Sequence, residues 1–295
     1  MSKVLNAELA VKLNCNLGEG PFWDSKKQEL YFVDISNKRV HIFAPSSNSV
    51  EAITFDQEIG AVLLGQNSEL IVAARDGLYA ATRDGELKTL LAPIDFGDSS
   101  IRCNDAKCDA NGRIWVGTMA FDFAEGAAAL YSFDSKDLKE VLSNLTIANG
   151  MGWSVDQKTM YFIDSQTSRV DTFDFDLASG AISNRQPFVT FSDPGVIPDG
   201  MTTDEDGGVW VALFGGSAVR RFDSSGKLTH TVSVPATQVT SCCFGGADMS
   251  ELFITTAQYA MDAEALSKDP LAGSLFRVKT TFKGSKSNRY GAITS

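Results

Sequence analysis

A hydrophobic block recurs six times along the chain, and this repeat restricts the possible folds more than any other feature. The blocks begin at Leu30, Leu70, Ile114, Met160, Val209 and Leu252. Their spacing is 40 to 49 residues, and polar turns and alternating segments such as RVHIF (39–43) separate them. A period in the forties with several short strands per unit is typical of β-propeller blades. We therefore predict an all-β fold, a six-bladed β-propeller.

The two ends of the chain predict how the ring closes. The sixth unit lacks a fourth strand after SLFRVKT (274–280), and residues 4–14 alternate weakly. We expect this N-terminal stretch to supply the missing strand, because closure removes exposed strand edges. No linker separates the units, so residues 1–295 are expected to form a single propeller domain. Residues 262–268 are expected to be helical, and the basic end after Phe282 is expected to be a loose, solvated tail.

Composition and charge limit the partners of the chain. The net charge is −11 and the pI about 4.7, which argues against nucleic acid and anionic membranes as partners. The first residues lack the apolar core of a signal peptide, and the chain has no apolar run of 18 residues. The five cysteines show neither CxxC spacing nor a disulfide framework, so we expect a cytoplasmic location. No obligatory protein partner is evident.

Four of the six units carry a carboxylate or an amide at the same register, 10 or 11 residues before the hydrophobic block. These residues are Glu19, Asn104, Asn149 and Asp199. The first strand of each propeller blade lines the central channel, so the four side chains are expected to meet at one mouth of it. A purely conformational role at a strand start is the alternative for any one of them. Four in one register favour a site.

The shared register predicts a site for one divalent cation. Two carboxylates in one site of low dielectric repel each other, and one of them takes up a proton unless a cation neutralises both. Oxygen ligands suit Ca²⁺, Mg²⁺ or Mn²⁺, with Zn²⁺ also possible. The two histidines of the chain, His41 and His230, lie outside this register. This argues against a Ser-His-Asp triad or a histidine-rich zinc site, and we expect structural roles for both.

Several sequence motifs, in the order in which they occur along the chain, resemble those of a known protein family. They are GEGPFWD (18–24), RCNDAKCDANGRIWVGTMA (102–120), ANGMGWS (148–154), IPDGM (197–201) and SCCFGG (241–246). Together they resemble the regucalcin/gluconolactonase family, also called the senescence-marker-protein/gluconolactonase/luciferin-regenerating group, from Leu17 to about Phe276. The resemblance implies a six-bladed propeller that hydrolyses sugar lactones with the help of a metal ion.

The resemblance also implies roles for individual residues. Glu19, Asn149 and Asp199 match the metal ligands of the family. Asn104 matches a residue that lies beside the metal and contacts the substrate, and Arg102 matches one that binds sugar hydroxyls.

A sixth residue, Asp122, matches a sugar-binding carboxylate that follows the GTM motif of relatives. Close relatives of regucalcin carry glutamate there, and the segment 121–128 is shorter than in animal regucalcins. If this segment forms a lid over the site, its length will affect the range of substrates.

These observations lead us to expect a lactonase of the gluconolactonase type, which opens a sugar lactone to its aldonic acid. The cation would polarise the lactone carbonyl, and Asp199 would act as the general base or orient the attacking water. One alternative is a phosphotriesterase resembling diisopropyl-fluorophosphatase. The other is a non-catalytic, calcium-binding propeller, against which Arg102 and Asp122 argue because metal storage needs no sugar-binding groups.

Overall fold

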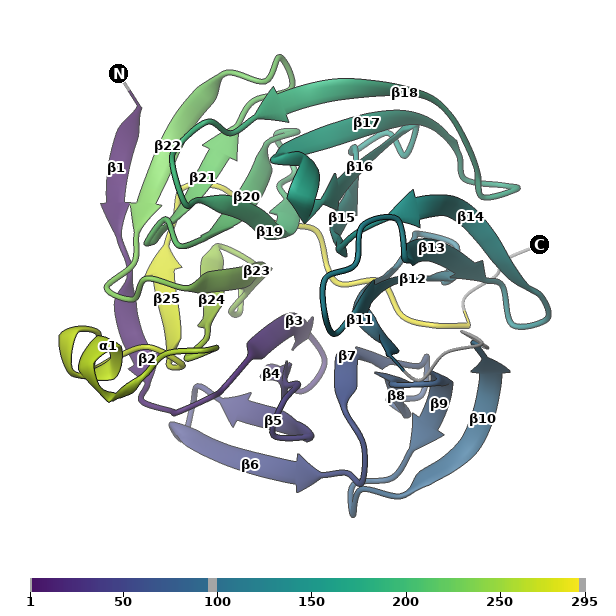
Figure 1. The fold of residues 1–295 in the computed structure, drawn as a ribbon, viewed down its shortest axis with the longest axis horizontal. Helices are drawn as coiled ribbons and strands as arrows, with labels where there is room; N and C mark the ends of the chain where they lie inside the picture. Colours follow the sequence, from purple (N-terminus) through teal and green to yellow (C-terminus); the bar gives the residue numbers. More distant parts are fainter. Residues whose placement is uncertain (1, 95–99, 292–295) are drawn as a thin grey trace.

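The computed structural model describes residues 2–94 and 100–291, and these form a ring of six sheets, five with four strands and one with five (Figure 1). Blades 1 to 3 contain, in chain order, β3 (Gly18–Asp24), β4 (Glu29–Asp34), β5 (Arg39–Ala44), β6 (Ser49–Thr54), β7 (Ile59–Leu64), β8 (Leu70–Ala74), β9 (Gly77–Ala81), β10 (Leu87–Pro93), β11 (Ile101–Cys108), β12 (Ile114–Ala120), β13 (Ala128–Phe133) and β14 (Leu138–Leu145).

Blades 4 to 6 contain β15 (Ala148–Trp153), β16 (Thr159–Asp164), β17 (Arg169–Asp176), β18 (Ala181–Thr190), β19 (Ile197–Thr203), β20 (Val209–Phe214), β21 (Ala218–Phe222), β22 (Leu228–Ser233), β23 (Val239–Gly245), β24 (Glu251–Thr256) and β25 (Leu275–Lys279). The six hydrophobic blocks are the second strands of the six blades, as the repeat predicts. The first strands β3, β7, β11, β15, β19 and β23 surround the centre of the ring (Figure 1).

The N-terminus closes the ring, as predicted, but it does so with two strands. β2 (Glu8–Val11) pairs antiparallel with β25 and is the fourth strand of blade 6. β1 (Lys3–Asn6) pairs in parallel with β22 and adds a fifth strand to blade 5, which the sequence did not predict. The N-terminal stretch therefore covers the outer edges of two neighbouring blades, where unpaired backbone groups would otherwise remain.

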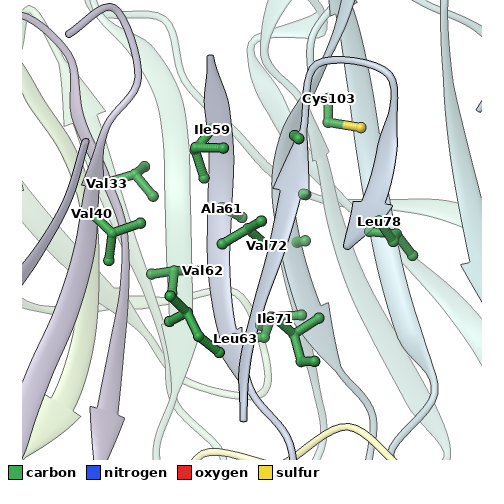
Figure 2. Close-up of a cluster of buried hydrophobic side chains, with 14 of the residues drawn as sticks. Val33, Val40, Ile59, Ala61, Val62, Leu63, Ile71, Val72, Leu78 and Cys103 are labelled. Atoms are coloured by element: carbon green, nitrogen blue, oxygen red, sulfur yellow. The ribbon is translucent and has the colours of Figure 1, made fainter. Parts of the chain in front are cut away.

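Apolar side chains between the blades form the core. In one such cluster, Val33 and Val40 of blade 1 lie beside Ile59, Val62 and other residues of blade 2 (Figure 2). These strands are buried on both faces, which explains why their sequences read as continuous apolar runs rather than as clean alternation. All five cysteines are buried and free, in agreement with the absence of a disulfide framework.

The predicted helix forms as α1 (Ala263–Lys268). Asp262 is its N-cap, and its side chain accepts a hydrogen bond of 2.8 Å from the backbone N–H of Ala265. No helix within residues 2–94 and 100–291 is long and apolar enough to cross a membrane.

The expectation of a loose basic tail was wrong. The segment after β25 runs back across the ring (Figure 1), and its side chains are held by several blades. The Phe282 ring packs edge-on against the His230 ring, with centroids 4.9 Å apart, and the Tyr290 ring stacks on Phe133, with centroids 6.0 Å apart. Asn288 Nδ2 donates a hydrogen bond of 3.2 Å to the carbonyl oxygen of Cys108. We call residues 280–291 the C-terminal strap. Its aromatic and amide groups find partners only in the folded ring, so charge alone gave a misleading prediction.

An ion pair anchors the strap. Arg289 donates to the carboxylate of Asp24, which is fully buried, and also to the Gly65 carbonyl at 3.0 Å. We predict that Arg289→Ala will lower the free energy of unfolding by about 2–4 kcal/mol, because the Asp24 charge loses its cation in the interior. Urea denaturation measures this effect. The exposed Lys286 provides the control, since Lys286→Ala should change stability by less than about 0.5 kcal/mol. Equal effects of the two substitutions would contradict the proposed role of Arg289.

Candidate functional site at one mouth of the channel

The four residues of the shared register line one cavity of about 400 Å³. Glu19 comes from β3, Asn104 from β11, Asn149 from β15 and Asp199 from β19, so four different blades contribute. All four side chains are buried, with 5–8 % of their surface exposed. The convergence that ring geometry predicted is therefore present, although up to 180 positions separate these residues in the sequence.

A β-bulge lies at this point in each of the four strands. Between Cys103 and Ala106, for example, two residues of β11 oppose one residue of β12. The same two-to-one mismatch follows Glu19 in β3, and it contains Asn149 in β15 and Asp199 in β19. Bulges bend a strand and redirect its side chains, and they are common beside active sites. β7 and β23, which lack a carboxylate or amide here, have a different irregularity, in which a single residue (Gly60 in β7 and Thr240 in β23) has no residue opposite it in the neighbouring strand.

Close contact between neighbouring inner strands also requires glycine. A Cβ atom on Gly150 would lie 2.6 Å from the carbonyl oxygen of Asp199, and one on Gly60 would lie 2.5 Å from the carbonyl oxygen of Cys103. Both distances are too short for a real side chain. The glycines next to the candidate residues therefore allow the backbones to approach closely enough for the side chains to meet.

Asn149 and Asp199 form a direct pair. Asn149 Nδ2 donates a hydrogen bond to Asp199 Oδ1, and it also donates to Ser165 Oγ at 3.2 Å. Asn149 Oδ1 is buried and has no hydrogen-bond partner. An unsatisfied buried acceptor is rare and calls for an explanation.

Asn104 and Arg102 form a second pair in the wall of the cavity. Arg102 Nη1 donates to Asn104 Oδ1 at 2.8 Å and to the carbonyl oxygen of Cys103 at 2.9 Å, while Asn104 Nδ2 donates to the Ala148 carbonyl at 3.1 Å. The amide of Asn104 is thus engaged at both ends, and it orients the guanidinium group. Both hydrogen bonds of the Arg102 guanidinium to described residues come from Nη1.

The site concentrates negative charge in a region of low dielectric. Burial, followed by the charges of Asp199 and Asp105, raises the pKa of Glu19 well above its ordinary value. Burial, followed by the charge of Asp105, does the same to the pKa of Asp199. Asp105 itself is buried, with a pKa raised by burial and lowered in part by the charge of Lys107. Ionisation of all three carboxyls together is therefore unfavourable, even though the charges of Arg102 and Lys107 partly offset it, and an added positive charge would favour it.

Lys107 was not singled out from the sequence. Its Nζ atom donates to the carbonyl oxygens of Met151, at 2.9 Å, and of Met201, so it joins the inner strands of blades 3, 4 and 5. Together with Asp105 it lines a second cavity of about 120 Å³, further along the same strands. Residues 285–288 of the C-terminal strap line this cavity too, so the strap covers the end of the channel away from the candidate site.

The residues fit a bound divalent cation. Glu19, Asn149 and Asp199 offer only oxygen atoms, which are the ligands that hard cations such as Ca²⁺, Mg²⁺ and Mn²⁺ prefer. A cation would neutralise the two carboxylates and would satisfy the unpartnered Asn149 Oδ1.

Asp122 lies apart from the other predicted residues. Its side chain is exposed and accepts a hydrogen bond from the Ala124 backbone N–H at 3.1 Å, as in a turn. It does not line the cavity, whereas its neighbours Phe121 and Phe123 do. A role in substrate binding therefore stays a prediction for Asp122.

The apolar part of the cavity was not predicted from the sequence. Besides the two phenylalanines, the lining includes Leu17, Ile35, Met119, Ile147, Ile197 and Phe214. Arg75 and Arg102 lie over the Phe121 ring, with guanidinium carbons 5.1 and 6.0 Å from its centroid. These residues come from loops and strand ends of several blades, and no shared register marks them in the sequence.

Replacing Glu19 by glutamine tests the electrostatics of the site. A raised pKa in the folded state means that the contribution of Glu19 to stability is present below about pH 4.5, its ordinary pKa, and is lost as pH rises through the raised value. In the presence of a chelator, we predict that Glu19→Gln raises Tm at pH 8 but has little effect at pH 4. Thermal unfolding of both proteins from pH 4 to 9 measures the difference. A difference in Tm that does not change with pH would contradict the assigned burial of the Glu19 charge.

The fold and the cavity together define a class: a six-bladed β-propeller with a candidate site of carboxylates, amides and arginine at one mouth of its channel. Residues 17–258 match the family model described as SMP-30/Gluconolactonase/LRE-like region, and the chain belongs to this family.

Curated relatives match almost the whole chain. The chain is 38 % identical to the Bacillus subtilis (strain 168) protein named "Putative sugar lactone lactonase YvrE" over 275 residues, which cover 92 % of this chain and 94 % of that protein. It is 36 % identical to human regucalcin over 281 residues, which cover 93 % and 94 % of the two chains.

Solved structures agree with this assignment. The crystal structure of a calcium-binding protein, regucalcin, from Agrobacterium tumefaciens superimposes with a TM-score of 0.94 at 25 % identity and covers 98 % of this chain and 99 % of that one. A luciferin-regenerating enzyme superimposes with a TM-score of 0.87 at 32 % identity and covers 96 % and 98 % of the two chains.

Proposed function

We propose that this protein is a metal-dependent sugar-lactone hydrolase of the gluconolactonase type, which opens aldonolactones to aldonic acids. The observation that carries the proposal is the cavity in which three oxygen donors from three blades, Glu19, Asn149 and Asp199, face the same space as the Arg102–Asn104 pair. A relative at 38 % identity bears a lactonase name, which supports the same conclusion.

Glu19, Asn149 and Asp199 would hold the cation, which when bound supplies Lewis-acid polarisation of the lactone carbonyl. Asp199 Oδ1 is held by Asn149, so the other carboxylate oxygen is left to accept a proton from the attacking water. Arg102, fixed by Asn104 and by the Cys103 carbonyl, presents its remaining N–H donors to the hydroxyls of the substrate. The apolar residues around these groups exclude water from the rest of the cavity, which strengthens the polar interactions within it.

The decisive experiment is a screen of sugar lactones with Mg²⁺, Mn²⁺, Ca²⁺ and Zn²⁺, each with a chelator control. We expect hydrolysis of at least one lactone that is lost on chelation and restored by a divalent ion. A phosphotriester assayed in parallel tests the phosphotriesterase alternative, which the apolar rim of the cavity also suits. Tight Ca²⁺ binding without turnover of any lactone would replace the enzymatic proposal by a calcium-binding role.

Phe121 offers a test of how the cavity holds its substrate. Its ring contacts the guanidinium groups of Arg75 and Arg102, and cation–π contacts of this kind contribute about 0.5–2 kcal/mol. We therefore predict that Phe121→Ala will raise KM about 3- to 10-fold with a smaller change in kcat, whereas Phe121→Tyr will retain both values. If Phe121→Ala left KM unchanged, the ring would have no part in holding Arg102.

Asp122→Asn, assayed in the same way, tests whether the exposed carboxylate contacts the sugar. A rise in KM is expected from the family resemblance.

A further inference from the structure

A second cluster of metal-ligating side chains lies where the ring closes. Ligand atoms of Cys15, Asp34 and His41 lie within 4.8 Å of one another, and all three residues are buried. This is the one such group of three or more histidine, cysteine, aspartate or glutamate side chains found within residues 2–94 and 100–291. None of the three lines the cavity at the channel mouth, so the cluster is separate from the candidate active site.

His41 is the least explained residue of the cluster. It is only 7 % exposed, and neither Nδ1 nor Nε2 has a hydrogen-bond partner. The imidazole stacks on Phe32 with ring centroids 5.1 Å apart, which fixes its plane. Buried histidines normally pair at least one ring nitrogen, because an unpaired polar atom in the interior lowers stability. A ligand for one of these nitrogens would remove the deficit.

The other two side chains can act as ligands in the same place. Asp34 Oδ1 accepts a hydrogen bond from the Leu17 N–H at 3.0 Å, and the Cys15 thiol donates a hydrogen bond to the same carboxylate, so a metal ion that displaces the thiol proton would lie between the two groups. Asp34 Oδ2 accepts from Asn16 N–H at 3.2 Å and from Asn37 Nδ2 at 2.8 Å, and these bonds hold the carboxylate in position. Cys15 is 3 % exposed and is not in a disulfide.

We propose that Cys15, Asp34 and His41 form a second metal site, specific for Zn²⁺ or a chemically similar transition metal, that fastens the closure of the ring. One sulfur, one nitrogen and one oxygen ligand suit Zn²⁺, whereas Ca²⁺ and Mg²⁺ bind oxygen. Binding replaces the thiol proton of Cys15, which leaves to solvent, and involves no change of oxidation state. Three protein ligands leave the fourth tetrahedral position to a water molecule.

The position of the cluster gives the site its role. Cys15 lies between β2, the outer strand of blade 6, and β3, the inner strand of blade 1, whereas Asp34 and His41 lie on β4 and β5 of blade 1. A metal ion would thus tie the closing segment to the first blade. Glu19 follows Cys15 by four residues on the same segment, so the ion would also restrict the strand that carries a predicted ligand of the channel site.

Co²⁺ added to the metal-free full-length protein tests the proposal, because thiolate ligation of Co²⁺ gives a charge-transfer absorption band in the near ultraviolet and oxygen ligation does not. We expect about one equivalent of Co²⁺ to produce this band in the wild type and in Glu19→Gln, which alters only the channel site. Cys15→Ser should abolish the band, and Cys108→Ser, which removes another buried cysteine, should retain it. Absence of the band from the wild type, or its persistence in Cys15→Ser, would overturn the proposal.

Thermal unfolding provides a second readout that does not depend on the cysteine variants. Excess Zn²⁺ should raise the Tm of the wild type and of Glu19→Gln by several degrees, because an ion that binds only the folded ring stabilises it. In the Glu19→Gln background, where the channel site is altered, His41→Phe retains a ring that can stack on Phe32 but removes the nitrogen ligands, so the double variant should fold and show no rise. A rise in the double variant equal to that of Glu19→Gln alone would show that the ion binds elsewhere. Loss of lactone hydrolysis in Glu19→Gln with the cobalt band intact would separate the two sites.

Discussion

Replacing Asp199 by asparagine is expected to lower kcat/KM for a sugar lactone by about 10³-fold or more, because the side chain is both a predicted metal ligand and the predicted base. The substitution preserves shape, and the new amide oxygen can still accept the hydrogen bond from Asn149 Nδ2. Folding should therefore be retained. Steady-state kinetics with the lactone identified in the screen, at saturating metal, measures the effect.

The control for Asp199→Asn is Asp206→Asn, an exposed aspartate in the next turn of the same blade, which should leave kcat/KM unchanged. Removal of the Asp199 charge should also raise the stability of the metal-free protein, since its pKa is raised by burial and by the charge of Asp105. An Asp199→Asn variant with kcat/KM within tenfold of the wild type would remove Asp199 from the mechanism.

The largest effect on stability is expected from Asp204→Ala. Asp204 is buried in the turn between β19 and β20, and it accepts hydrogen bonds from Gly208 N–H at 2.7 Å, from Trp210 Nε1 at 2.7 Å and from Arg221 Nε at 2.6 Å. Its removal leaves the Arg221 guanidinium buried without a counter-charge, which should lower the free energy of unfolding by about 3–5 kcal/mol. Urea denaturation of the full-length protein measures the loss.

Two further variants separate charge from packing in this network. Asp223→Ala removes an aspartate from an exposed turn of the same blade and should have little effect on stability. Asp204→Ala combined with Arg221→Met should be more stable than Asp204→Ala alone, because the buried charge is then absent. If the double variant were no more stable than the single one, the loss would arise from the turn rather than from the ion pair.

Part of this hydrogen-bond network can be predicted from the sequence and part cannot. Residues 109–112 and 204–208 belong to the polar turns of the repeat, and Asp109 accepts a hydrogen bond from Trp115 Nε1 at 3.0 Å, as Asp204 does from Trp210 Nε1. The spacing of six residues from aspartate to tryptophan is visible in both repeats. The arginines differ: Arg113, which pairs with Asp109, lies only four residues away, whereas Arg221, which pairs with Asp204, comes from a later strand, so that pair is decided by folding.

The candidate site likewise has features that the sequence predicts and features that only the folded structure shows. Glu19, Asn104, Asn149 and Asp199 were found from the repeat alone, since equivalent positions of a ring must lie at the same height around its axis. Their burial and the two-to-one bulges were not predicted, because a bulge depends on the pairing between strands. The only local sign in the sequence is a glycine beside three of the four residues, and a glycine alone does not predict a bulge.

The sequence by itself determined the six-bladed ring, its closure by the N-terminal strand and the register of the candidate residues, because these follow from a periodic pattern that is local to each repeat. Tertiary structure alone decided the apolar wall of the cavity, the C-terminal strap, the second N-terminal strand in blade 5 and the meeting of Cys15, Asp34 and His41. Each of these joins segments that share no period. Such contacts depend on which surfaces the closed ring brings together, and no single stretch of the chain contains that information.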